Sequence, residues 1–218
     1  DQTYSRQYFG LPQYSFIYAC FNQTYKLDPV MFKVWMRLLE QTANSVLWLY
    51  SDGNQTTITN LKQQAEKHNI SGDRLFFAKF LPRAEHLARL KLVDLALDTR
   101  IYNGHTSTSD ALWAGVPVIT LYGKHFASRV ASSLLNAVNL ANECVTYSLE
   151  DYEKVSLKYA NSRKNLVALK NKLKENLLSS ALFDSKLFSI NLEKCYTEIW
   201  RNYKNNIKKS IIDVASIE

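Results

Sequence analysis

The sequence predicts a doubly wound parallel α/β fold followed by a C-terminal helical extension. Three observations predict it. Short β-rich runs alternate with amphipathic stretches through the first 150 residues, which is the pattern of an α/β domain with a parallel sheet. Most of these runs are nearly continuous in apolar residues, as expected for strands covered on both faces. Beyond residue 149 the strand signal fades and helical periodicity dominates.

The expected strands are short and apolar, and turn-forming or polar residues bound them. They are SFIYACF (15–21), SVLWLYS (45–51), RLFFAKF (74–80), DLALDT (94–99) and PVITLYG (117–123).

The expected helices lie between these strands. The first, over residues 29–43, has Asp28 as its cap and Pro29 in its first turn, an arrangement that favours helix starts. The others cover residues 56–70, 83–93, a segment beginning near Thr106, and 125–140. We expect residues 1–148 to form a ligand-binding lobe. Residues 149–218 are expected to add helices over 149–180 and 184–206, which pack on that lobe or on one outside this chain.

Composition narrows the class of protein. With 218 residues and 46% hydrophobic content, the chain suits one large domain or one lobe of a larger enzyme. It has no apolar run long enough to span a bilayer and no secretory signal pattern, so we expect no membrane partner. Three widely spaced cysteines, Cys20, Cys144 and Cys195, indicate reduced thiols in the cytoplasm or nucleus.

The basic charge is uneven along the chain. Residues 151–218 hold 13 Lys and Arg against 8 Asp and Glu, and so account for +5 of the net +7. These cations are spread through helical segments without interleaved aromatic residues, which favours solvated helix faces over a nucleic-acid surface. We therefore expect no nucleic-acid partner.

Polar residues gather in three predicted bends from strand to helix. The bends are FNQTYKLDP (21–29), FLPRAEHLAR (80–89) and YNGHTSTSDALWAGVPVIT (102–120). Because parallel sheets bind ligands at the carboxyl ends of their strands, we expect the three bends to meet at one edge.

The third bend suits a diphosphate. Gly104 lets the backbone pass close to a ligand, and residues 106–109 open a helix whose N–H groups and hydroxyls attract anions. Asp110, one turn into the helix, suits two sugar hydroxyls. Each residue also has a purely structural interpretation: the hydroxyls as helix caps, His105 as an ordinary histidine and Asp110 as a complement to the helix dipole.

The first two bends add cations. Lys26 offers a compact mobile charge and Gln23 an amide, although a loop lysine usually faces solvent. In the second bend, Arg83 precedes His86 and Arg89, which are three residues apart on one helical face. There a ring and a guanidinium could meet a nucleotide base, or the face could simply be an exposed basic one.

The sequence lacks the motifs that several other kinds of chemistry require. It contains no D-x-D, no paired His or Cys spacing, no G-x-S-x-G, no Walker A loop and no G-x-G-x-x-G. These absences argue against hydrolase, kinase and dehydrogenase functions. A phosphate site here must then rely on Lys26 and helix dipoles, so we expect no metal and no other cofactor.

Taken together, five blocks of this sequence resemble the C-terminal catalytic lobe of the O-linked N-acetylglucosamine (O-GlcNAc) transferases. The blocks are FNQTYKLDP, NSVLWL, RLFFAKFLPRAEHLARLKLVDLALDT, NGHTSTSDALWAGVPVIT and ASRVASSLL, within a similarity from about Phe9 to Tyr203. The resemblance implies a GT-B fold of two Rossmann-like lobes, of which this chain is the donor-binding one, preceded in the whole protein by tetratricopeptide repeats. It also implies transfer of N-acetylglucosamine from UDP-GlcNAc to Ser or Thr of nuclear and cytoplasmic proteins.

Matching motif positions imply roles for the residues near the phosphates and the sugar. Lys26 would neutralise the departing diphosphate, with support from Gln23. His105 would reach the sugar, while Thr106 and Ser107 would hold phosphate. Lys26 and His105 are thus the expected catalytic residues.

The resemblance likewise implies a nucleoside site. Asp110 would bind the ribose together with Arg83. His86 and Arg89, with the backbone near Leu81, would frame the uracil.

The sequence departs from the animal enzymes at four of these positions. Arg83 stands where a lysine is usual and Ser107 where a threonine is usual, and both changes are chemically close. Leu81 replaces an alanine and Thr108 a glycine, and these larger side chains are expected to tighten the pocket.

The implied reaction is an inverting, metal-independent transfer, whose general base the sequence does not identify. Alternatives are a SPINDLY-like protein O-fucosyltransferase that uses a GDP-sugar, a bacterial-type N-glycosyltransferase that uses UDP-glucose, and a non-catalytic scaffold module. His105 favours the N-acetylglucosaminyl branch, because SPINDLY-like proteins lack this histidine. Lys26, His105 and Asp110 together argue against a scaffold. By itself this lobe is expected to bind UDP weakly and to transfer nothing.

Overall fold

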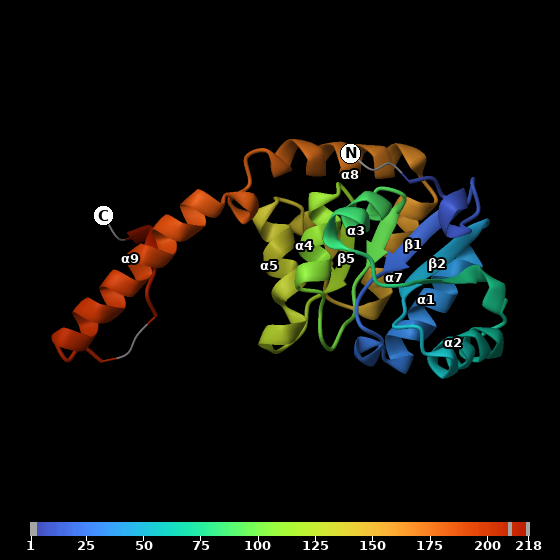
Figure 1. Ribbon diagram of the computed structural model, residues 1–218, viewed down its shortest axis with the longest axis horizontal. Coiled ribbons are helices and arrows are strands. Elements are labelled where there is room, and N and C mark those ends of the chain that lie inside the picture. The colour runs from blue at the N-terminus through green and yellow to red at the C-terminus, as the bar shows by residue number, and fades with distance from the viewer. Residues whose placement is uncertain (1–3, 209–210, 217–218) are drawn as a thin grey trace. The chain divides into compact units, whose positions relative to one another are not determined.

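The computed structural model describes residues 4–208 and 211–216, and its first part is a parallel α/β sheet domain (Figure 1). Six strands pair in the order β3-β2-β1-β4-β5-β6, and every pair is parallel. The predicted doubly wound fold is therefore confirmed. The strands are β1 Phe16–Cys20, β2 Ser45–Tyr50, β3 Leu75–Ala78, β4 Leu95–Leu97, β5 Val118–Leu121 and β6 Val145–Thr146.

The strand order reverses at the centre of the sheet. From β1 the chain winds outward through β2 to β3, then returns to β4 on the other side of β1 and winds outward again to β6. Ile17 and Tyr18 of β1 are fully buried, because β1 is paired on both sides and covered on both faces. Such a reversal separates the loops after the two central strands, which opens a crevice at their carboxyl ends.

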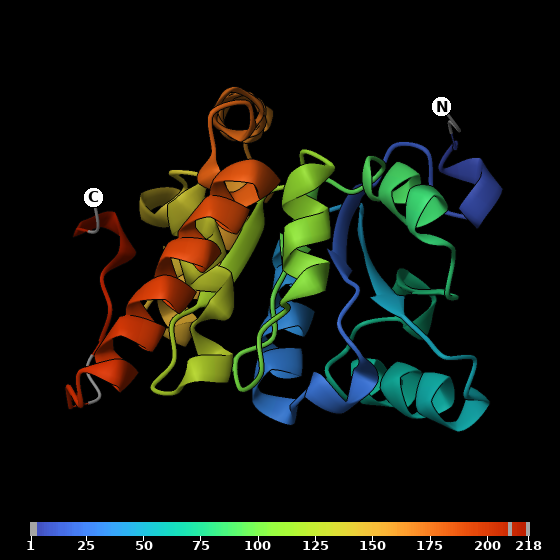
Figure 2. The same ribbon diagram turned by 60° about the vertical axis from the view of Figure 1, so that its left-hand side comes forward.

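Helices cover both faces of this sheet (Figure 2). Helices α1 and α7 pack together on one face, whereas α3, α4 and α5 lie on the other. Among the described residues, no helix combines the length and the apolarity that a membrane span requires. The helices are α1 Pro29–Gln41, α2 Gln55–Lys67, α3 Arg83–Leu90, α4 Thr106–Trp113, α5 Val130–Ala137, α6 Ala141–Cys144, α7 Leu149–Ala160, α8 Arg163–Leu177 and α9 Ser185–Lys204.

The sheet domain extends further than the sequence predicts. Its compact unit ends at Leu178 and not at residue 148. The reason is that α7 belongs to the core: Tyr152 is fully buried, accepts a hydrogen bond from Trp35 Nε1 at 3.3 Å and donates one to the carbonyl of Asp98 at 3.1 Å. In α8, Lys170 Nζ donates to the carbonyl of Val93 at 3.0 Å, beside the amino end of β4 and opposite the crevice.

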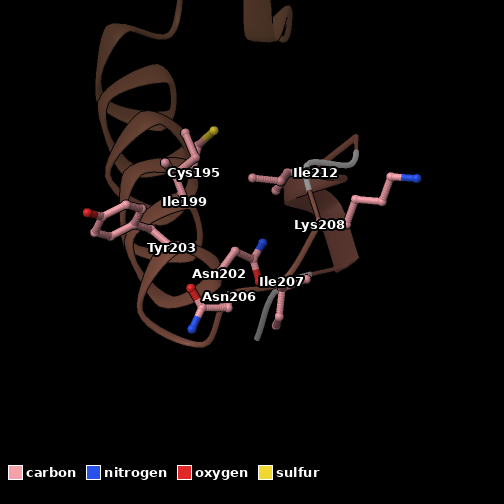
Figure 3. A pocket seen from close by; sticks show the side chains of 8 residues that line it. All are labelled: Cys195, Ile199, Asn202, Tyr203, Asn206, Ile207, Lys208 and Ile212. Carbon is pink, nitrogen blue, oxygen red and sulfur yellow. The ribbon is translucent and has the colours of Figure 1, made fainter.

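Residues 179–218 form a second compact unit around α9. Its apolar side chains are largely exposed, among them Phe188 and Trp200. A hollow of about 780 Å³ lies between α9 and the segment that follows it. Figure 3 shows its lining side chains, with Ile212 pointing toward Cys195 and Ile199. The thiol of Cys195 is free, as are the two cysteine thiols of the first unit.

Candidate functional site

The candidate site lies at the reversal point of the sheet, where the loops after β1 and β4 meet. The loop after β1 turns through a short 3-10 helix, Thr24–Lys26. This turn directs Lys26 Nζ across the crevice to the carbonyl oxygen of Asn103, 2.9 Å away in the loop that precedes α4. Two of the three polar bends of the sequence are thus in direct contact.

Lys26 is held in a half-buried position. Its ammonium lies 3.8 Å from the centre of the Tyr102 ring, in addition to its bond to Asn103. Burial lowers the pKa of Lys26, and the nearby Asp98 carboxylate opposes this effect. The ammonium is therefore a partly desolvated cation, and such charges attract anions more strongly than solvated ones.

Helix α4 begins without a side-chain cap. Its N-cap position is His105, which makes no capping hydrogen bond. The Ser107 hydroxyl donates instead to Asn22 Oδ1, and Thr106 is exposed. The interpretation of these hydroxyls as helix caps is therefore wrong, and the first-turn amides are left to an outside acceptor such as phosphate.

His105 faces the same crevice as a neutral ring. Burial and then the charge of Lys26 lower its pKa, against a hydrogen bond with the backbone of Ala127. The ring packs edge-on against Tyr102, with 5.1 Å between ring centres. Its Nε2 atom is buried and has no hydrogen-bond partner within the described part of the chain. A buried polar atom of this kind costs free energy unless a ligand or water satisfies it.

Asp110 and Arg83 connect the second and third bends. Asp110 is 6% exposed, and its Oδ1 accepts a hydrogen bond from Arg83 Nη2 at 3.2 Å, whereas the Arg83 side chain is 75% exposed. The two residues predicted to share the ribose are thus already paired, Asp110 from one turn into α4 and Arg83 from the first position of α3.

The remaining predicted contacts lie around these groups. The Gln23 side chain is exposed, and the backbone carbonyl of Gln23 accepts the backbone N–H of Lys26 at 2.9 Å. Leu81 is half-buried and directly precedes Pro82, the N-cap of α3.

Arg89 does not face the crevice as the helical spacing suggests. It is only 3% exposed, and its guanidinium donates to the carbonyl of Lys79 at 2.6 Å and to His86 Nδ1 at 3.0 Å. It also lies over the Phe21 ring, 4.9 Å from the ring centre. Arg89 therefore supports His86 from behind. Burial, followed by the charge of Arg89, lowers the pKa of His86 to about 4, so the ring is neutral at pH 7.

Replacing Arg89 with Ala is expected to lower the free energy of unfolding by about 3 kcal/mol, because Lys79 and His86 lose a buried donor and a cavity forms. Urea unfolding at pH 7 measures the change. Arg83→Ala is the matched control, because the Arg83 side chain is exposed and solvent screens its bond to Asp110, which should contribute about 1 kcal/mol or less. Equal losses in both variants would contradict the supporting role of Arg89.

A buried polar network beneath the loops was not predicted. At its centre Asp98, at the end of β4, accepts hydrogen bonds from Gly104 N at 2.6 Å, Asn22 Nδ2 at 3.1 Å and Thr120 Oγ1 at 2.6 Å. Asn22 in turn accepts from Ser107. The network thus ties the loops after β1 and β4 to β5. The available signal was the pair Asp98-Thr99 directly after an apolar strand, the position from which parallel sheets present functional groups.

Asp98 is expected to make stability depend on pH. Burial raises its pKa to about 6 from 3.8, although the surrounding hydrogen bonds lower it. A carboxyl group with a raised pKa contributes stability that is fully present below its unfolded pKa and is lost as pH rises through about 6. Between pH 7 and pH 5 the wild type should therefore gain about 1 kcal/mol relative to Asp98→Asn.

The measurement is urea unfolding of both chains at pH 7, 6 and 5. The comparison cancels groups common to both, including His86, whose lowered pKa acts in the opposite direction. Parallel stability curves for the two chains would show that Asp98 does not titrate in this range.

This chain is similar along most of its length to known glycosyltransferases. The model of glycosyl transferase family 41 matches residues 2–192. The "Probable UDP-N-acetylglucosamine--peptide N-acetylglucosaminyltransferase SEC" of Arabidopsis thaliana is 38% identical over 195 residues, which are 89% of this chain and 20% of that protein. A Caenorhabditis elegans UDP-N-acetylglucosamine--peptide N-acetylglucosaminyltransferase is 30% identical over 203 residues, 93% of this chain and 18% of that protein.

A solved structure shares the fold. The K341M mutant of the Thermobaculum terrenum O-GlcNAc transferase superposes with a TM-score of 0.83 and 31% identity, covering 89% of this chain and 38% of that one. This likeness confirms the Rossmann-like lobe of a GT-B fold. The chain spans about a fifth of the length of the curated relatives it matches. On the family model and these relatives together, the chain belongs to glycosyl transferase family 41.

Proposed function

We propose that this chain is the donor-binding lobe of an inverting, metal-independent protein O-GlcNAc transferase that uses UDP-GlcNAc. The observation that carries the proposal is the contact of Lys26 with Asn103 beside the uncapped start of α4. It places an ammonium and free helix amides together, and both suit a diphosphate. The two relatives above, whose names specify UDP-N-acetylglucosamine and peptide, support this donor and this acceptor.

The proposed chemistry assigns this lobe to the leaving group. A Ser or Thr hydroxyl oxygen of a protein attacks the anomeric carbon, and the bond from that carbon to the phosphate oxygen breaks. The bonding electron pair passes to the UDP diphosphate, where Lys26 and the first amides of α4 stabilise the new charge. Donors aimed at developing charge are worth most in a site that is already organised and partly dry. These groups supply the positive charge that a metal would otherwise provide.

The nucleoside and the sugar would contact the rest of the crevice. Asp110 would accept hydrogen bonds from the ribose hydroxyls, and Arg83 would donate one to them. His86 would face the uracil beside Leu81. His105 Nε2 would reach the sugar. A protein acceptor and the general base would come from outside this chain. Such an enzyme would act in the cytoplasm and nucleus, with no membrane or nucleic-acid partner.

A GDP-sugar donor is the alternative that the resemblance to SPINDLY-like proteins raises. The tomato (Solanum lycopersicum) "Probable UDP-N-acetylglucosamine--peptide N-acetylglucosaminyltransferase SPINDLY" is 30% identical over 191 residues, 85% of this chain and 20% of that protein, and its name specifies UDP-N-acetylglucosamine. The higher identity to SEC, 38%, favours the N-acetylglucosaminyl branch.

Thermal unfolding with UDP, GDP or AMP present tests the donor. A ligand that binds only the folded chain stabilises it by about 2.7 kcal/mol at a hundredfold excess over its Kd. Stabilisation by UDP alone is the expected result, stabilisation by GDP alone would favour the fucosyl alternative, and none by either would favour a scaffold. Lys26→Met is the matched control, because its weaker binding should reduce the UDP response at the same concentration to about half or less.

A further inference from the structure

We infer that Tyr102 is a positioning residue for the donor diphosphate, because its ring holds the Lys26 ammonium in place before the ligand arrives. The inference rests on the proposed function. Tyr102 contacts both Lys26 and His105, with 3.8 Å from the ammonium to the ring centre and 5.1 Å between the two rings.

The charge that Lys26 presents depends on which groups hold its ammonium. Among the salt bridges of the described residues, none involves Lys26. A carboxylate partner would hold the ammonium but cancel its charge. A carbonyl oxygen and the face of an aromatic ring hold it through dipole and quadrupole instead. Its charge is then not cancelled by a direct ion pair, although Asp98 acts on it from a longer distance.

The geometry of the Lys26 ammonium leaves one of its N–H donors for a ligand. An ammonium has three N–H donors. One points to the carbonyl of Asn103 at 2.9 Å, and the ring of Tyr102 covers another direction. This leaves one N–H for a ligand. A lysine has a long flexible stem, and fixing it in advance removes part of the entropy that binding would otherwise cost.

Hydrogen bonds of the loop after β4 hold the backbone of Tyr102 in place. Its carbonyl accepts the Thr99 hydroxyl at 2.6 Å, and the Thr99 carbonyl accepts Asn103 Nδ2 at 2.7 Å. Thr99 and Asn103 are fully buried, so the backbone of the loop is anchored in the polar network under the site. The Tyr25 ring is a further neighbour, with 6.5 Å between the ring centres. The Tyr102 ring thus has the rings of His105 and Tyr25 as neighbours, and hydrogen bonds anchor the backbone that carries it.

The test compares Tyr102→Leu and Tyr102→Phe with the wild type by calorimetric titration with UDP and with uridine. Removing a partly desolvated cation–π contact is expected to weaken UDP binding about five- to twentyfold. Uridine affinity should stay unchanged, because uridine carries no phosphate to meet Lys26. Tyr102→Phe keeps the ring and should bind UDP like the wild type. An equal loss of UDP and uridine affinity in Tyr102→Leu would indicate a merely structural role and overturn the inference.

A second measurement needs no ligand. The ring should shift the NMR signals of the Lys26 ε-methylene protons upfield in the wild type and in Tyr102→Phe, but not in Tyr102→Leu. No shift in the wild type would overturn the inference whatever the titrations give. If the shift is present and the wild type does not bind UDP, the proposed function fails. The contact then stands without a role in donor binding, and the inference is overturned with it.

Discussion

Lys26→Met is expected to lower the rate of sugar transfer by about 100- to 1000-fold, because the leaving diphosphate loses its cation. UDP affinity should fall about tenfold or more, the typical loss for one hydrogen bond to a charged group. Titration of this chain with UDP measures the affinity. Transfer is assayed in a chain extended to the length of the family relatives.

Stability separates a functional loss from a folding defect in this variant. Burial lowers the pKa of Lys26, so the folded state disfavours its charge, and Met should leave the unfolding free energy unchanged or higher. Lys33→Met is the matched control, because Lys33 is an exposed residue of α1 and its loss should leave UDP affinity unchanged. Near-normal transfer by Lys26→Met would contradict the role given to this residue.

Gly104→Ala is expected to have the second largest effect, on stability and on binding together. A Cβ atom at this position would lie 2.4 Å from Thr108 Oγ1, 2.7 Å from Ser107 Oγ and 2.8 Å from Asn22 Oδ1. These atoms belong to the packed start of α4 and to the network around Asp98, so they have little room to move. Overpacking of this kind costs about 2–3 kcal/mol, and the displaced loop should weaken UDP binding more than tenfold. Urea unfolding and UDP titration of this variant measure both effects.

A double-mutant cycle shows whether the clash is the cause. Thr108→Ala removes the nearest clashing atom and keeps a good helix former. In the double variant it should recover part of the stability that Gly104→Ala loses, while the contacts with Ser107 and Asn22 prevent full recovery. Strictly additive losses would show that the glycine is not needed for this close approach.

The sheet was predictable because most of its strands coincide with apolar runs in the sequence. Residues 45–51 and 117–123 are examples, and the structure places β2 and β5 within them. β6 was missed, because Val145–Thr146 is too short to give a pattern. The helical segment predicted over residues 149–180 is broken at Asn161 and Ser162, where the Ser162 hydroxyl caps α8. A serine inside a periodic stretch does not reveal whether it caps a new helix or faces solvent.

The sequence predicts that the polar bends meet at one edge of the sheet, but it does not predict the contacts within the site. Parallel topology alone brings Lys26 to the loop before α4. It does not reveal that Arg89 turns inward under His86, because a basic residue on a helical face has the same spacing whether it is buried or exposed. Nor does it reveal that Asp98 stays buried, because that depends on three donors from separate segments.

The crystal structure of this chain with UDP is the most direct test of the account. The two phosphates are expected to lie between Lys26 Nζ and the backbone amides of Thr106 and Ser107, with donor–acceptor distances of about 3 Å. A diphosphate bound at any other edge of the sheet, with Lys26 still engaged only by Asn103 and Tyr102, would contradict it.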